Sequence, residues 1–150
     1  MKALLLDNVE DPHNVGGILR SAEVFGFTSV CLPKKGVPEV YPSVVKVSTG
    51  ATEFMKISRN DSANGYARKA AEEGYRIVAL DMAGKSTLQE VATAGHEKLL
   101  LVIGGEDRSV GQFILNMAED VVGIQQHGKG YSLNASVAAG TARFALGQAK

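Results

Sequence analysis

The chain has few of the features that would place it outside ordinary soluble proteins. It contains one cysteine, Cys31, and no tryptophan among 150 residues, which excludes an intramolecular disulfide and any motif built on paired cysteines. Its longest uninterrupted apolar run, 99–103, is far shorter than the about 20 residues that span a bilayer. Near the start, Asp7 ends an apolar stretch that is too short for a signal-peptide core. The sequence predicts a cytoplasmic protein with no membrane partner.

An excess of positive charge is also missing. Sixteen Lys and Arg residues balance sixteen Asp and Glu residues, so the formal net charge is zero. Any nucleic-acid partner would therefore have to bind at a local basic patch. The three histidines, His13, His96 and His127, lack the spacing of a metal site, and we expect no metal. Apolar residues at 45% and charged residues at 21% are typical of a folded globular chain.

Short apolar runs alternate with helical patterns along the chain. Five of these runs are continuous rather than alternating, which is typical of strands covered on both faces. They are 3–6, 29–32, 76–80, 99–103 and 121–124. Helical spacing is found in 15–25, in 64–73 with Gly74 as the C-cap, and in 133–148. This order predicts an α/β fold with three layers around a mostly parallel sheet, as a single domain over 1–150.

Polar, glycine-rich loops follow four of these predicted strands. They are 7–14, 81–86, 104–109 and 125–132. Ligands of open parallel sheets bind outside the carboxyl ends of the strands. We therefore expect the binding site in these loops, concentrated in the second half of the chain.

The first candidate site lies on the predicted helix after the first strand. Its apolar face carries Val15 and Leu19, which places Arg20 on the opposite face, beside Gly16 and Gly17. A guanidinium next to an open helix N-terminus suits a phosphate or a developing oxyanion. The alternative is an exposed arginine on a helix with two packing glycines.

The second candidate stretch is 103–111, directly after the most apolar strand. It lacks both the Walker ending and the Rossmann glycine pattern. Gly104 and Gly105 would allow the backbone to approach a ligand, and Glu106 would accept a hydrogen bond. The alternative is a tight turn followed by a capped helix.

The third candidate stretch is 123–140, at the mouth of the last helix. Ser132, Asn134 and Ser136 stand where capping residues are expected, but capping accounts well for only one of the three. Cys31, in contrast, lies inside an apolar strand and has no partner pattern for catalysis.

The three stretches, in this order, resemble the three motifs of the SpoU (TrmH) branch of the SPOUT RNA methyltransferases. Asn14, Gly16 and Arg20 are similar to its Asn-x-Gly-x-x-x-Arg helix, and 104–106 is similar to its glycine-glutamate loop. Residues 132–140 are similar to its Ser-Leu-Asn-x-Ser-Val-Ala-Ala-Gly signature. The segment 46–51 also looks like a family stretch, so the resemblance spans essentially the whole chain.

The resemblance implies a deep trefoil knot in the C-terminal portion, against the general rule that chains do not knot. It implies binding of S-adenosyl-L-methionine at the knot. The residues that match the adenosine site are Leu80, Gly104, Ile124 and Leu133. The family's proposed catalytic residue corresponds to Arg20, and the residues that match its supporting positions are Asn14, Glu106, Ser132 and Asn134.

The function implied is methylation of a ribose 2'-hydroxyl in tRNA or rRNA, by a homodimer without a separate RNA-binding domain. The apolar stripe of the last helix, which includes Leu133 and Val137, also favours a homodimer. One alternative is a non-catalytic RNA-binding or assembly protein, because Asp107, Gln125 and Gln126 depart from the family pattern. A second alternative is a Rossmann-like oxidoreductase, ranked last because the early Gly-x-Gly-x-x-Gly turn is absent.

Overall fold

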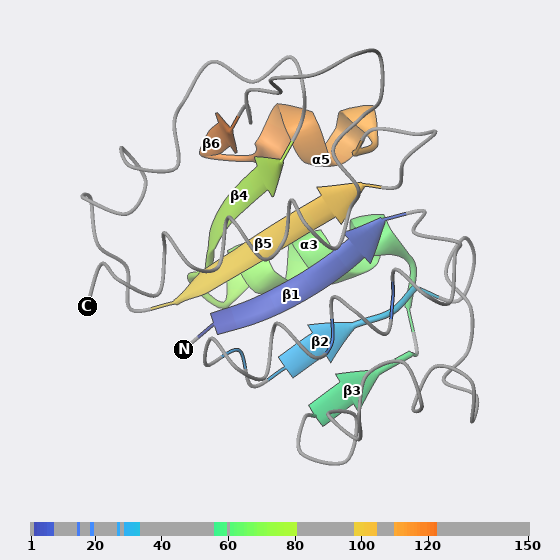
Figure 1. Ribbon diagram of the computed structural model, residues 1–150. Helices are drawn as coiled ribbons and strands as arrows, with labels where there is room; N and C mark the ends of the chain where they lie inside the picture. Colours follow the sequence, from blue (N-terminus) through green and yellow to red (C-terminus); the bar gives the residue numbers. More distant parts are fainter. Residues whose placement is uncertain are drawn as a thin grey trace.

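The computed structural model describes a parallel sheet and two helices (Figure 1). It describes residues 2–7, 15, 19, 27, 29–33, 56–59, 61–80, 98–104 and 110–122. The elements, in chain order, are β1 (Lys2–Asp7), β2 (Ser29–Cys31), β3 (Lys56–Ser58), α3 (Ala63–Glu72), β4 (Arg76–Leu80), β5 (Leu99–Gly104), α5 (Gln112–Met117) and β6 (Asp120–Val122).

The strands form one six-stranded sheet in the order β3-β2-β1-β5-β4-β6. Every pairing between neighbouring strands is parallel. The parallel sheet predicted from the sequence is confirmed, and all five predicted strands are present. β3 was not predicted, because its three residues, Lys-Ile-Ser, contain no apolar run. β1 and β5 pair along their whole length in the centre, from Lys2↔Leu99 to Asp7↔Gly104.

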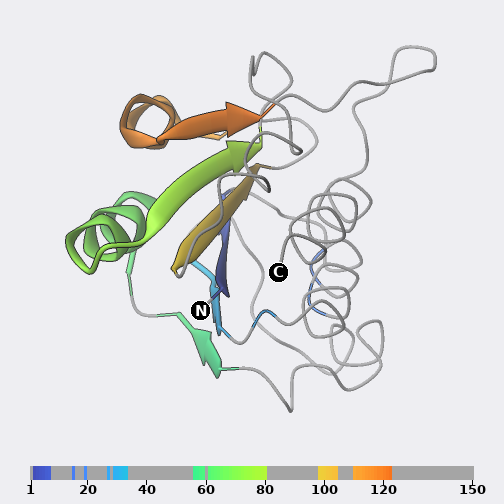
Figure 2. The ribbon, with the colours of Figure 1, turned by 90° about the vertical axis from the view of Figure 1, so that its left-hand side faces the viewer.

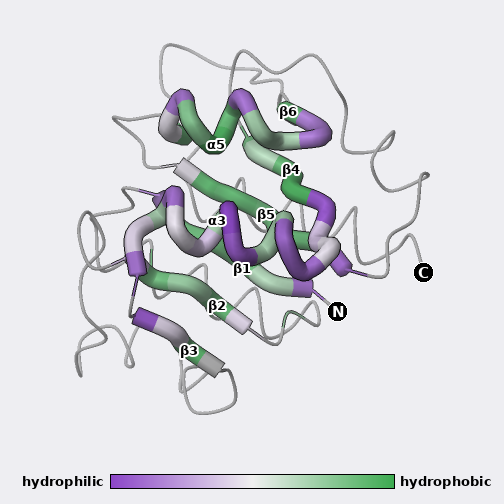
Figure 3. The backbone as a smooth tube through the Cα atoms, turned by 180° about the vertical axis from the view of Figure 1, so that it is seen from behind, coloured by the Kyte–Doolittle hydropathy of each residue, from purple (hydrophilic) through white to green (hydrophobic). Residues whose placement is uncertain are grey.

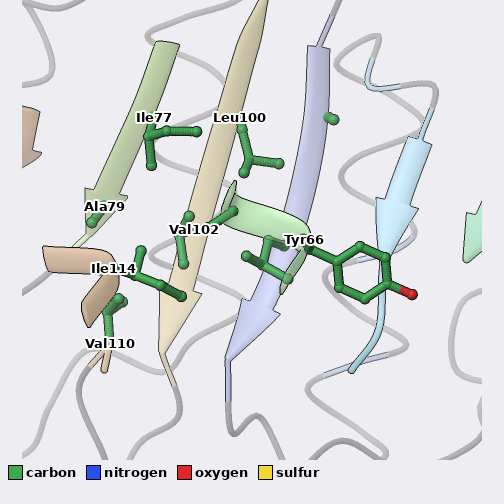
Figure 4. Packing of buried hydrophobic residues seen from close by; sticks show 10 residues of the cluster. Tyr66, Ile77, Ala79, Leu100, Val102, Val110 and Ile114 are labelled. Carbon is green, nitrogen blue, oxygen red and sulfur yellow. The ribbon is translucent and has the colours of Figure 1, made fainter. Parts of the chain in front are cut away.

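The core is built on the two faces of the central strands. In β5, every residue from 99 to 103 is at most 3% exposed, so both faces are covered, as the continuous apolar run predicted. α3 and α5 lie on the same side of the sheet (Figure 2). On that side, Tyr66 of α3 and Ile114 of α5 pack against Ile77, Leu100 and Val102 (Figure 4). Each such fully buried side chain contributes roughly 1.5–3 kcal/mol.

α3 shows how local sequence sets the ends of a helix. Ser62 is the N-cap, and its Oγ accepts a hydrogen bond from the Gly65 N–H at 3.0 Å. At the other end, the N–H groups of Gly74 and Tyr75 donate to the carbonyls of Ala71 and Ala70, which is the Schellman motif. The sequence predicted a helix over 64–73 with Gly74 as the C-cap. The C-cap is Glu73, and Gly74 follows it with φ +88°.

The outer surface of α3 is polar, while the strands behind it are apolar (Figure 3). Arg68 and Lys69 are exposed, and Tyr66 and Ala67 are buried against the sheet. The helix therefore has the amphipathic pattern of a covering layer. The predicted last helix, 133–148, and the C-terminal portion that would form a knot lie outside the described residues.

Candidate functional site

The candidate site is the edge of the sheet where β1, β5, β4 and β6 end. These strands are consecutive neighbours in the sheet and pair in parallel, and the arrows of β1, β5 and β4 point the same way in Figure 1. Asp7 pairs with Gly104, Leu80 with Ile103, and Leu80 also with Val122. The four strands that precede the predicted ligand-binding loops therefore end side by side at one edge. In open parallel sheets this is the edge where ligands bind.

Two of the residues matched to the adenosine site, Leu80 and Gly104, lie at this edge. Leu80 ends β4 and is 8% exposed, and Gly104 ends β5 on the neighbouring strand and is partly buried. Side chains alternate along a strand, so Leu80 faces away from the core cluster that contains Ala79. The edge thus presents one apolar side chain and one stretch of backbone without a side chain.

Asp7 is a residue of this edge that the sequence analysis did not single out, although it begins the loop 7–14. It is 7% exposed, and among the described residues it is the one charged side chain that is buried. Its Oδ2 accepts a hydrogen bond from the Gly111 N–H at 2.8 Å. Gly111 is the N-cap of α5 and has no side chain to cap the helix. An acidic residue at the end of a fully apolar strand was the available signal.

β6, which precedes the third candidate stretch, is fixed to β4 by side chains. The Arg76 Nε donates to Asp120 Oδ2 at 2.7 Å, and Nη2 of the same guanidinium lies 2.7 Å from that oxygen. The Asp120 carboxylate accepts this hydrogen bond and raises the pKa of Arg76. Glu119 forms a second link, because its carboxylate accepts from the Ile77 N–H and its own N–H donates to the Ile77 carbonyl.

Several kinds of chemistry find no support in the described part of the chain. Burial raises the pKa of the Cys31 thiol to about 11, so this thiol stays protonated at neutral pH and is a poor nucleophile. No three His, Cys, Asp or Glu side chains among the described residues are grouped to hold a metal ion. None of the described helices is long and apolar enough to cross a bilayer.

The other predicted site residues lie outside the described residues and remain predictions. They are Asn14, Arg20, Glu106, Ile124, Ser132, Leu133 and Asn134. Their neighbours Val15 and Leu19 are described, and both are helical and fully buried. The apolar face predicted for the helix that carries Arg20 is therefore confirmed at these two positions.

Fold and edge together define an open parallel α/β sheet, a class of fold that binds ligands outside the carboxyl ends of its strands. A model of the SpoU rRNA methylase family matches residues 1–144. The chain belongs to the SpoU rRNA methylase family. A Bacillus subtilis protein assigned to the TrmH family of tRNA/rRNA methyltransferases, YacO, is 34% identical over 137 residues. That match covers 91% of this chain and 54% of YacO.

Solved structures agree with this assignment. A Porphyromonas gingivalis protein assigned to the TrmH family of RNA methyltransferases has a TM-score of 0.84 at 29% identity, over 97% of this chain and 58% of that one. A protein solved to study 2-OH methylation of C/U34 on tRNA has a TM-score of 0.83 at 25% identity, over 97% and 93%. The chain thus spans about half the length of some relatives and nearly all of another.

Proposed function

We propose that this chain transfers the methyl group of S-adenosyl-L-methionine to a ribose 2'-hydroxyl of structured RNA, either tRNA or rRNA. The observation that carries the proposal is the family match over residues 1–144, in a chain whose matched residues Leu80 and Gly104 end neighbouring strands. Relatives assigned to tRNA/rRNA methylation, and one studied for 2-OH methylation of tRNA, support the substrate class.

The residues at the sheet edge fit this cofactor. Leu80 offers an apolar side chain for an adenine ring, and the Gly104 backbone is free of a side chain at the end of β5. Ile124 and Leu133 are proposed to complete the adenosine site. When bound, the cofactor supplies a methyl group that is already activated as part of a sulfonium cation. The protein's work is then to align the ribose oxygen with that methyl group and to manage one proton.

Arg20 is proposed to stabilise the charge that develops on the ribose oxygen. An alcohol is a poor nucleophile at neutral pH, and a fixed cation lowers the energy of the developing alkoxide. A guanidinium keeps its proton, with a pKa above about 12, so Arg20 serves as a charged clamp on oxygen and phosphate rather than as a base. Asn14, Glu106, Ser132 and Asn134 are proposed to support the site. The proton passes to water, to a substrate phosphate or to Glu106.

We also propose that residues after β6 form the trefoil knot of the family, and that two copies pair through the last helix and the Arg20 helix. A chain with no net positive charge needs additional basic residues to contact RNA phosphates. Pairing would double the number of basic residues available to RNA. Sedimentation at low micromolar concentration tests the dimer, and a monomer that methylates RNA would refute it. If the site is shared, mixing Arg20→Ala with Gly104→Val subunits restores part of the activity.

Two measurements test the proposed function. In calorimetry, the chain binds S-adenosyl-L-methionine and does not bind NAD. RNA from cells that lack the protein loses one ribose methylation, which the purified protein restores. A chain that binds RNA without binding S-adenosyl-L-methionine would instead be a non-catalytic RNA-binding protein, and the proposal would be wrong.

Variants separate the two proposed roles. Arg20→Ala lowers turnover by on the order of 100-fold or more, as for the loss of an oxyanion donor, and leaves cofactor affinity unchanged. Arg20→Lys restores only part of the activity, because the planar fork is lost. Gly104→Val abolishes cofactor binding, because its side chain occupies space at the end of β5. Normal turnover by Arg20→Ala would remove this residue from the mechanism.

A further inference from the structure

Asp7 contacts both ends of the same connection. This connection, 105–111, joins β5 to α5 and contains Glu106. At its start, Gly104 is the register partner of Asp7 in the sheet. At its end, the Gly111 N–H donates to Asp7 Oδ2 at 2.8 Å. One residue of β1 therefore fixes the position of both ends of the connection.

The chemistry of Asp7 does not match a role in packing alone. Residues 3 and 5 lie on the same face of β1, and both are apolar members of the core cluster. An aliphatic side chain would continue this pattern, whereas a carboxylate buried at 7% exposure carries a desolvation cost that its hydrogen bonds must offset. A carboxylate that accepts a backbone N–H forms a charge-assisted hydrogen bond, which is stronger than a neutral one.

The end of the β5–α5 connection that Asp7 binds is also packed in the core. Val110, which directly precedes Gly111 in the connection, is 2% exposed and belongs to the same cluster as residue 5 of β1. The hydrogen bond adds direction to this apolar contact, because it sets the orientation of the peptide group between Val110 and Gly111. Together they fix Val110 and Gly111 against the end of β1.

We propose that Asp7 is a positioning residue: its carboxylate, through the Gly111 N–H, holds the β5–α5 connection in the arrangement that binds S-adenosyl-L-methionine. Asp7 does not touch the cofactor in this role, and it acts by holding Gly111 at the end of the connection that begins after Gly104, which is proposed to bind the cofactor. The proposal rests on the proposed function for the identity of the ligand. The contact itself is independent of any ligand.

The hydrogen bond can be removed from either side. Asp7→Leu removes the acceptor, and Asp7→Asn keeps an oxygen that accepts more weakly. Gly111→Pro removes the donor, and the backbone φ of −59° at this residue is the value that proline adopts. Gly111→Ala is the matched control: it keeps the N–H, and its added Cβ lies 3.4 Å from Asp7 Oδ2, an ordinary contact.

Amide hydrogen exchange of the ligand-free protein tests the contact. We expect Asp7→Leu and Gly111→Pro to raise exchange in 105–110 about tenfold or more, as for the loss of a hydrogen bond to a charged group. Gly111→Ala stays within about twofold of the wild type. β1 and β5 stay protected in all four variants. Unchanged exchange of 105–110 in both Asp7→Leu and Gly111→Pro would overturn the inference.

Calorimetry with S-adenosyl-L-methionine tests the consequence. Asp7→Leu and Gly111→Pro weaken binding about tenfold or more, Asp7→Asn restores part of the affinity, and Gly111→Ala binds normally. Ser62→Ala, which loses the N-cap hydrogen bond of α3, controls for lower stability alone and binds normally. Equal affinity of Asp7→Leu and wild type would refute the positioning role. A wild type that binds no S-adenosyl-L-methionine would refute the proposed function, while exchange would still decide the role of Asp7.

Discussion

The Cys31 thiol makes the stability of this protein depend on pH in the alkaline range. Burial in β2 raises its pKa from 9.0 to about 11, because the charged thiolate is disfavoured away from water. The unfolded chain therefore loses the thiol proton before the folded chain does. The stabilisation is fully present below pH 9 and is lost as the pH rises through 11. Each pKa unit corresponds to about 1.4 kcal/mol, so about 1 kcal/mol is lost by pH 10.

Urea unfolding of wild type and Cys31→Ala at pH 8 and pH 10 measures this effect. Cys31→Ala loses packing at both pH values but has no thiol to ionise. We expect the difference in unfolding free energy between the two proteins to shrink by about 1 kcal/mol between pH 8 and pH 10. Lysines and tyrosines titrate equally in both proteins and cancel. A difference that does not change with pH would refute the reasoning. The folded thiol should also react slowly with a disulfide reagent at pH 8.

Three further predictions concern stability. In a double-mutant cycle, Arg76→Ala and Asp120→Ala should show a coupling free energy of about 0.5–1 kcal/mol. This coupling should fall in 1 M salt, because the Arg76 side chain is 34% exposed. Zero coupling in low salt would contradict this prediction. Gly74→Ala should lower the unfolding free energy by about 1–2 kcal/mol, because the backbone φ at this residue is +88°. The added Cβ itself would meet no other atom within 4 Å. An unchanged melting temperature would exclude this backbone strain. Leu101→Ala should cost about 2–5 kcal/mol in urea unfolding, because Leu101 is fully buried in the central strand.

The central strands could be predicted from the sequence because burial on both faces leaves a continuous apolar run. This holds for β1, β4 and β5, whose residues are almost all buried. β3 has three residues at the edge of the sheet, and only Ile57 among them is apolar. A strand of this kind is formed by pairing with its neighbour, here through Val30↔Ile57. That partner is distant in sequence and leaves no local pattern.

The candidate site was predictable where it depends on strand ends and not where it depends on strand order. Polar loops after apolar runs indicated the carboxyl edge, and the structure places the starts of those loops together. The contact between Asp7 and Gly111 joins residues 104 positions apart. It exists because β5 lies beside β1, which no spacing along the chain indicates. The alternative considered for 103–111 was a tight turn followed by a capped helix. The helix α5 does follow, with Gly111 as its N-cap and no side-chain cap hydrogen bond, and Asp7 accepts from the Gly111 N–H.

Strand order also explains how the strands that lead into three distant candidate stretches end at one edge of the sheet. β1 leads into the first stretch, β5 into the second and β6 into the third, and β4 lies between β5 and β6. Because β5 inserts between β1 and β4, the first two stretches begin at paired residues, Asp7 and Gly104. The third follows β6, two strands away from β5, and the Arg76–Asp120 ion pair fixes the start of β6 to β4. The ends of β5 and β4, where Gly104 and Leu80 lie, are therefore between the strands that lead into the first and third stretches.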